Sequence, residues 1–142
     1  MNNGTTNKEF PPMPKECTIT THGKGTETEV QNALTALKTC MYCFSLMEEP
    51  QNNLFKFLKY LHISEAFNTH TLRLLRKMIK TASTQTEKAT FLRAFTLLSA
   101  NVHLYALMQD KDTNVFKFLD SVKKASENTK QVTKYLTDLQ TD

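Results

Sequence analysis

The sequence is poor in the residues that interrupt regular structure. Only three glycines and four prolines occur among 142 residues, and Pro11, Pro12 and Pro14 all fall within the first fourteen. Because glycine and proline are the strongest local breaks, the rest of the chain is expected to run in long elements. The length fits a single domain whose core needs no metal or disulfide to hold it together.

Long apolar runs are also missing. No run approaches the length needed to cross a bilayer, and the N-terminal MNNGTTNKEF lacks the apolar segment of a signal peptide. We therefore expect a soluble protein with no membrane span, either intracellular or secreted without its signal. A net charge of +4 and a pI near 9.0 favour acidic partners at long range, but the charge is lower than that of a dedicated nucleic-acid binder.

What the chain does contain is helical periodicity. We expect a flexible arm over residues 1–25, where no periodicity is visible, and one all-α domain over 26–142. Apolar residues recur at spacings of three and four in four segments, which predict helices over about 26–49, 51–80, 87–109 and 113–139.

The boundaries of these helices follow from a few residues. Thr26 or Thr28 would start the first helix, Pro50 would end it, and TASTQT at 81–86 would form a turn. The stretch HISEAFNTH at 62–70 leaves two alternatives open. It is either a break, with Ser64 capping a new helix, or part of a continuous helix that turns Ile63 and Phe67 inward.

The two halves of the helical region resemble each other. At an offset of 61, the segment 33–58 aligns with 94–119, and 10 of its 26 positions are identical. Each half is then a helical hairpin that cannot cover its apolar stripe alone, so two copies would bury one another. Because the linkers are short, consecutive helices should be antiparallel neighbours in an up-down-up-down four-helix bundle.

Most residues that could catalyse a reaction or bind a metal have a structural explanation instead. Cys40 and Cys43 form a single CxxC inside a predicted helix, without the second ligand pair that zinc needs, so we expect packing cysteines. Asn101, with Asn68 and Thr129 at comparable positions, falls among the apolar residues that face the core (the helix seam), where we expect it to fix helix register. No acid–base pair, phosphate loop or nucleophile motif is recognisable, so we expect no enzyme activity, cofactor or metal.

A basic stripe lies on the second predicted helix. Arg73, Arg76, Lys77 and Lys80 follow the i, i+3, i+4, i+7 spacing of one helical face, opposite Leu75. The stripe is either a solvated outer face or a surface for an acidic protein partner. Nucleic acid is not expected, because no aromatic residues interleave with the cations. An intracellular adaptor or assembly subunit binding through this face is one functional hypothesis.

Three segments resemble short-chain four-helix cytokines of the interleukin-4 and interleukin-7 type. TEKATFLRAFTLL at 86–98 resembles the second helix of interleukin-4, and residues 17–20 and 29–37 resemble its start and first helix. Residues 52–57 are similar to a pattern of interleukin-7. Together these segments cover about a third of the chain.

The resemblance implies a secreted signalling ligand that binds receptor ectodomains. It implies that Glu29 and Arg93 contact the receptor, since they match an acidic residue and an arginine used by the family. A secreted chain would also make a disulfide from Cys17 to Cys40 or Cys43 plausible. The family's paired cysteines are mostly absent here, and its bundles run up-up-down-down with long crossover loops. If the resemblance does not hold, we expect a cytoplasmic protein.

Overall fold

The computed structural model describes residues 26–49 and 54–140, and these residues form four helices and no strand. In chain order they are α1 (Thr26–Met47), α2 (Leu54–Thr81), α3 (Gln85–Met108) and α4 (Val115–Gln140). The all-α prediction is therefore confirmed. The predicted arm at 1–25, Cys17, and the boundary residues Pro50 and Gln51 lie outside the described residues.

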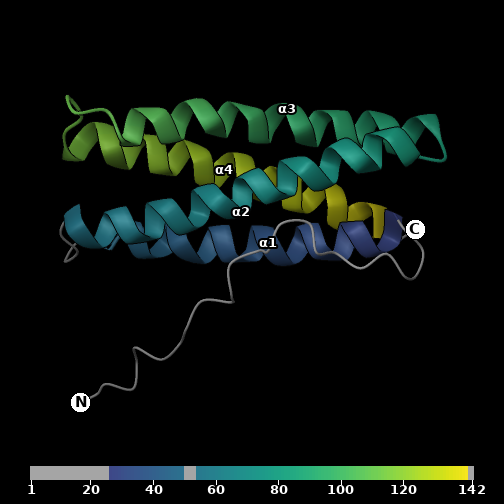
Figure 1. Ribbon diagram of the computed structural model, residues 1–142, viewed down its shortest axis with the longest axis horizontal. Helices are drawn as coiled ribbons and strands as arrows, with labels where there is room; N and C mark the ends of the chain where they lie inside the picture. Colours follow the sequence, from purple (N-terminus) through teal and green to yellow (C-terminus); the bar gives the residue numbers. More distant parts are fainter. Residues whose placement is uncertain (1–25, 50–53, 141–142) are drawn as a thin grey trace, which may run out of the picture.

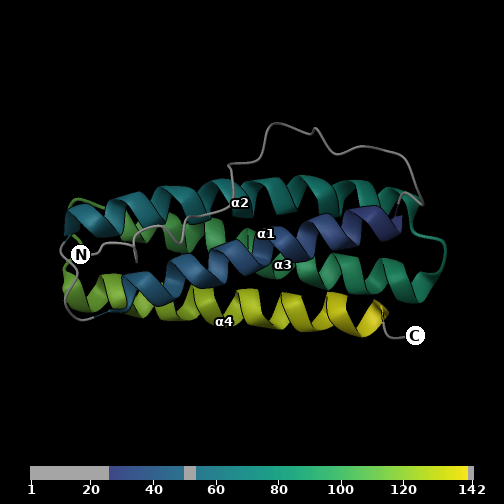
Figure 2. The same ribbon diagram turned by 90° about the horizontal axis from the view of Figure 1, so that it is seen from below.

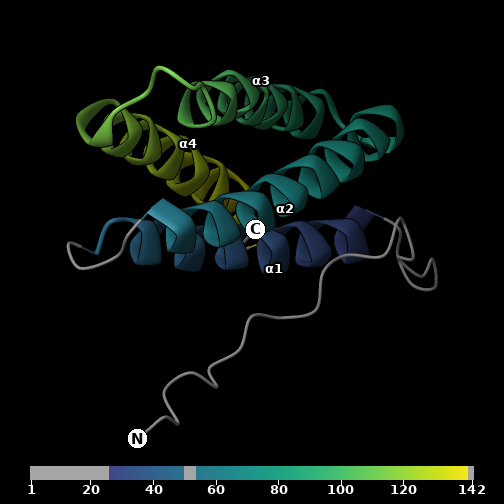
Figure 3. The same ribbon diagram turned by 60° about the vertical axis from the view of Figure 1, so that its left-hand side comes forward.

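The helices form an up-down-up-down bundle (Figure 1). Each helix packs against the next one in the chain, and α1 also packs against α4, whereas the described residues make no backbone contact between α1 and α3 or between α2 and α4. Figure 2 accordingly shows α2 and α4 on opposite sides of α1, and Figure 3 shows α1 and α3 on opposite sides of the bundle. The arrangement predicted from short linkers is confirmed.

The 61-residue repeat is visible in the packing. Buried residues of the first hairpin have buried counterparts in the second, as in the pairs Val30 and Phe91, Leu37 and Leu98, and Leu61 and Val122. Phe44 and its counterpart Tyr105 stack on each other inside the bundle, with ring centroids 6.4 Å apart and planes inclined by 25°. The hairpins thus bury each other through equivalent positions, as the repeat predicted.

The interior has two apolar clusters, one toward each end of the bundle. The first is centred on Phe44, Met47, Phe67, Tyr105 and Phe118. The second includes the following residues: Val30, Leu37, Leu75, Met78, Phe91, Leu98 and Leu136. Between them the bundle buries the polar side chains of Asn68, Thr71, Asn101 and Thr129, and Ser64 is buried beside Leu61 and Phe67 of the first cluster. Along the bundle, the core therefore has a polar layer between two apolar layers.

Helix α2 is continuous through 62–70, which decides between the two alternatives for this segment. Phe67 is buried and Ile63 is half-buried, as a continuous helix requires, yet Ser64, Asn68 and Thr71 are buried as well. Polar residues can stay inside because their hydrogen bonds are satisfied there. The Ser64 hydroxyl donates to the carbonyl of Leu61 at 3.0 Å, and the Thr71 hydroxyl donates to that of Phe67 at 2.8 Å.

The starts of α3 and α4 are set by capping residues. Thr84 caps α3, because its hydroxyl accepts from the backbone N–H of Glu87 at 3.0 Å while the Glu87 carboxylate accepts from the backbone N–H of Ser83 at 3.0 Å. Asn114 caps α4 in the same way, accepting from the N–H of Lys117 at 2.9 Å. Helix α3 therefore begins two residues earlier than the turn assigned to 81–86 had suggested.

Candidate protein-binding faces

The four cations of α2 share one exposed face, here called the basic face and made of Arg73, Arg76, Lys77 and Lys80. The opposite side of the helix packs Leu74, Leu75 and Met78 into the core. Burial of those apolar side chains fixes the rotation of α2, and this rotation sends all four charges outward. The shared face expected from the spacing is present.

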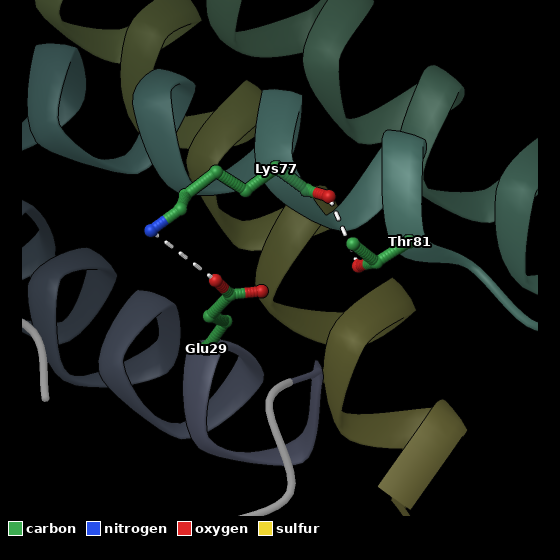
Figure 4. Close-up of polar contacts among 3 residues, drawn as sticks. All are labelled: Glu29, Lys77 and Thr81. Carbon is green, nitrogen blue, oxygen red and sulfur yellow. Dashed lines mark hydrogen bonds and ion pairs between the residues drawn. The ribbon is translucent and has the colours of Figure 1, made fainter. Parts of the chain in front are cut away.

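Two of the candidate binding residues contact each other. Lys77 Nζ lies 3.7 Å from a carboxylate oxygen of Glu29 on α1, and the Glu29 side chain is only 13% exposed while that of Lys77 is 50% exposed (Figure 4). The backbone carbonyl of Lys77 also accepts from the Thr81 hydroxyl at 3.0 Å. Such a half-exposed pair stabilises the α1–α2 hairpin by about 1 kcal/mol at most. Little of the Glu29 carboxylate remains for a partner.

Arg76 is also engaged within the bundle. Its guanidinium carbon lies 5.7 Å from the ring centroid of Phe95 on α3, a cation–π contact that links α2 to α3. Within the residues that the structure describes, neither Arg73 nor Lys80 forms an ion pair. These two residues are the part of the basic face that is most available to an external carboxylate.

Arg93 lies elsewhere on the molecule. It is exposed on α3 and borders a shallow surface hollow with Leu92, Thr96, Leu97 and Tyr135, the last of which belongs to α4. The structure thus brings Glu29 to the basic face but places Arg93 on the α3–α4 side. The residues suggested by the cytokine resemblance and by the charge pattern do not form a single surface.

The CxxC cysteines are interior residues. Cys40 and Cys43 are free and fully buried in the apolar cluster around Phe44. Burial raises the pKa of the Cys43 thiol to about 12 and raises the pKa of Cys40 well above its ordinary value, with the neighbouring Cys43 adding to the effect. Cys40 donates to the carbonyl of Ser64 at 3.5 Å. Both thiols therefore lack the thiolate character and exposure of a reactive site.

The polar residues at core-facing positions, Asn68, Asn101 and Thr129, form a hydrogen-bond network across three helices. Asn101 Nδ2 on α3 donates to Asn68 Oδ1 on α2 and to Thr129 Oγ1 on α4, both at 3.2 Å. Asn101 Oδ1 accepts from Asn128 Nδ2 at 3.0 Å, and Asn68 Nδ2 donates to the carbonyl of Leu98 at 3.2 Å. The network aligns α2, α3 and α4 at one level of the bundle. Its geometry suits the setting of helix register.

Three features of the polar network and of the basic face were not predicted from the sequence: the part played by Asn128, the Glu29–Lys77 pair and the Arg76–Phe95 contact. Asn128 precedes the core-facing Thr129 and does not fall in the alternating series of three and four shown by the apolar residues of α4. The Glu29–Lys77 pair joins residues 48 positions apart, and neither it nor the Arg76–Phe95 contact carries a local pattern. The cap of α3 was not predicted either, although it has a recognisable sequence signature: Thr84 is followed three residues later by Glu87.

Two further properties bear on what the bundle can bind. No group of three His, Cys, Asp or Glu side chains in the described ranges could hold a metal ion. Helix α3 is long and apolar enough, by length and composition alone, to cross a membrane, which differs from the expectation that no run approaches this length. A core helix of a soluble bundle passes the same test, and α3 buries the seam from Phe91 to Met108 inside this bundle.

Comparison with known proteins adds no relative. No protein family, curated protein or solved structure matches this chain. The candidate faces therefore have to be judged on their own geometry and charge.

Proposed function

We propose that this protein is a non-enzymatic binding module, an adaptor or assembly subunit that docks an acidic protein surface on the basic face of α2. One observation carries the proposal. Four cations lie on a single exposed helical face, and the ion pair they make with a described residue goes to a carboxylate that is itself largely covered.

The contrast with α4 supports this assignment. On α4, Lys124 lies 3.1 Å from Asp120 and Lys134 lies 3.3 Å from Asp138, so two of its five lysines are paired with a carboxylate one turn away in the same helix. Helix α2 has 28 residues but contains Glu65 as its only acidic residue. Arg73, Arg76 and Lys80 therefore have no acidic residue one turn away on α2, and their charges are directed toward solvent, where they attract and orient an acidic partner.

The residue types on the basic face also suit carboxylate recognition. The guanidinium groups of Arg73 and Arg76 can each bind a carboxylate through two parallel hydrogen bonds. The contact of Arg76 with Phe95 holds one of these groups in place before binding, which lowers the entropy lost on association. Arg73 and Lys80, one on each side of it along the helix, supply the longer-range attraction.

Charge reversal at the two outer positions tests the proposal. We expect R73E/K80E to weaken binding of a fluorescent oligoglutamate peptide at physiological salt by about tenfold or more, since both substitutions replace attraction by repulsion. The variant K123E/K130E on the exposed side of α4 is the matched control, because it changes the net charge equally. Fluorescence anisotropy measures the affinity, and thermal unfolding by circular dichroism verifies the fold.

Equal losses in the two variants would contradict the proposal, because net charge alone would then explain the binding. Tighter binding of a random DNA duplex than of the peptide, lost in R73E/K80E, would assign the basic face to nucleic acid instead. Preserved peptide binding in R73E/K80E would show that the basic face is a solvated surface with no role in binding.

A secreted receptor ligand is the second candidate, and the exposure of Arg93 favours it. Against it, Glu29 is mostly covered and paired with Lys77, and the up-down-up-down order differs from that of the cytokines the sequence resembles. Intact mass after alkylation under denaturing conditions without reductant distinguishes the two. The ligand predicts one alkylated thiol and one disulfide involving Cys17, whereas the adaptor predicts three alkylated thiols.

A further inference from the structure

The outer face of α3 differs from those of the other helices in carrying almost no charge. Its outermost residues follow one another at spacings of three and four, and together they are called the α3 stripe: Lys88, Leu92, Thr96, Ser99, His103, Ala106 and Asp110. All are exposed except Ser99, which is half-buried. Between Ala94 and Met108 the sequence contains no Asp, Glu, Lys or Arg.

Exposed apolar side chains widen this stripe. Leu92 is 46% exposed, Val102 51% and Leu107 52%, and all three lie on α3. A hollow of about 700 Å³ adjoins the stripe toward α4, lined mainly by apolar atoms of Ala100, Leu104, Ala106 and Leu107. Three exposed apolar side chains on a helix face that is uncharged between Ala94 and Met108, beside a hollow lined by apolar atoms, suit contact with another macromolecule.

The two charged ends of the stripe are placed against the preference of an isolated helix. Lys88 lies in the first turn of α3 and Asp110 lies just beyond its C-terminal cap. The helix dipole favours acidic residues at the N-terminus and basic residues at the C-terminus, so both charges oppose it. The helix dipole therefore does not account for either charge, although the Asp110 carboxylate also accepts from the Asp112 N–H in the α3–α4 turn. A partner of matching charge would compensate both residues.

We propose that the α3 stripe is the interface of a symmetric homodimer, in which α3 helices of two copies pack antiparallel about a two-fold axis at Ser99. Lys88 and Asp110 lie eleven residues on either side of Ser99. In the antiparallel pair, Lys88 of each copy therefore faces Asp110 of the other, and the symmetry makes this pairing twice.

Side-chain size is complementary about the same axis. Leu92 and Ala106 lie seven residues on either side of Ser99, so the large side chain of one copy meets the small one of the other. Leu92 then enters the hollow that Ala106 and Leu107 border. At the centre, Thr96, Ser99 and Ala100 are short enough to let the helix axes approach closely. An acidic protein would not suit a face that lacks cations along its middle.

This dimer would present two copies of the basic face of α2. Simultaneous engagement of two acidic sites would raise the apparent affinity without any new contact. Self-association and peptide binding are measured separately, so failure of one proposal is distinguishable from failure of the other.

Sedimentation equilibrium of the full chain tests the dimer. We expect the wild type to dimerise, and K88E or D110K to weaken dimerisation about tenfold, because each substitution places two like-charge pairs in the interface. The double variant K88E/D110K, which restores opposite charges with exchanged positions, is expected to recover wild-type association. The matched control K130E changes one exposed lysine to glutamate on α4 and is expected to have no effect.

The Asp110 carboxylate accepts from the N–H of Asp112 at 2.9 Å, so D110K could also act by disturbing the α3–α4 turn. A second variant tests the interface without changing this turn. Thr96→Lys places a charge in the uncharged middle of the stripe and is expected to abolish the dimer while leaving the melting temperature of the monomer unchanged. Three results would overturn the proposal: a wild type that is monomeric at concentrations up to about 1 mM, no effect of K88E or Thr96→Lys, or a double variant no better than the single ones. Binding of a monomeric wild type to neutral phosphatidylcholine vesicles, lost in Thr96→Lys, would assign the stripe to a membrane surface instead.

Discussion

Replacement of Asn101 by leucine provides a direct measure of what the polar layer contributes to stability. Leucine has nearly the shape of asparagine, so Asn101→Leu removes the hydrogen bonds without opening a large cavity. The Asn68 and Thr129 acceptor oxygens, both on fully buried residues, then lose their donor, and the half-buried Asn128 amide loses its acceptor. The substitution therefore tests hydrogen bonding separately from packing.

The expected cost follows from the number of groups left without partners. A buried polar group that loses its partner costs about 1–3 kcal/mol, and Asn68 and Thr129 keep their donor bonds to the carbonyls of Leu98 and Ala125. We therefore expect Asn101→Leu to lower the free energy of unfolding by about 2–4 kcal/mol. That is a large fraction of the total for a domain of this size, which is about 5–15 kcal/mol. Urea denaturation followed by circular dichroism measures it.

The matched control converts the whole layer to apolar residues of the same shape. N68L/N101L/T129V removes the partners along with Asn101, so no buried group of the three is left unsatisfied. We expect this triple variant to regain most of the stability that Asn101→Leu loses. We also expect it to lose uniqueness of packing, visible as broadened methyl resonances, because the apolar layer no longer fixes the helix register. A cost below about 1 kcal/mol for Asn101→Leu, or a triple variant no more stable than the single one, would refute the reasoning.

Two further predictions concern single buried groups. The buried Tyr105 hydroxyl lies near the Ser64 hydroxyl but makes no hydrogen bond of good geometry among the described residues, and its repeat counterpart is Phe44. Tyr105→Phe should therefore raise the free energy of unfolding by about 1 kcal/mol at most; a clear loss in urea denaturation would show that the contact with Ser64 stabilises the bundle. Burial, and secondarily the charge of Arg73, lowers the pKa of His70 below its ordinary value of 6.5, so the unfolded chain binds more protons and stability should fall as pH decreases through 6.5 toward the folded-state pKa. His70→Gln should flatten this dependence between pH 7 and 5, and an unchanged slope would assign the effect to other groups.

The fold was readable from the sequence because its signals are local and repeated. The spacing of Val30, Leu37 and Phe44 predicts one helical stripe, and the same spacing 61 residues later predicts a second that can cover it. Short linkers then leave antiparallel neighbours as the simplest arrangement. The start of α3 was misplaced because TASTQT reads as a turn by composition, although Thr84 and Glu87 form a cap within it.

The candidate faces were less predictable because they depend on contacts between distant segments. The spacing of Arg73, Arg76, Lys77 and Lys80 predicts a shared face, but only the packing of α1 on α2 shows that Lys77 meets Glu29. Similarly, Asn101, Asn68 and Thr129 were recognisable as polar seam positions. Their convergence, and the addition of Asn128, depends on the relative height of three helices, which no local pattern encodes.

The end of the bundle at which the chain leaves α4 brings several helix termini together. Glu27 and Gln31 of α1, Glu87 of α3 and Gln140 of α4 border one surface hollow there. Since residue 140 ends beside the start of α1, a short linker could join them, and the chain could instead be opened in the turn between α2 and α3. The resulting circular permutant would begin with the second hairpin and end with the first, yet it would keep every helix contact. Folding of this permutant would show that the order in which the hairpins are synthesised is separable from the structure they form.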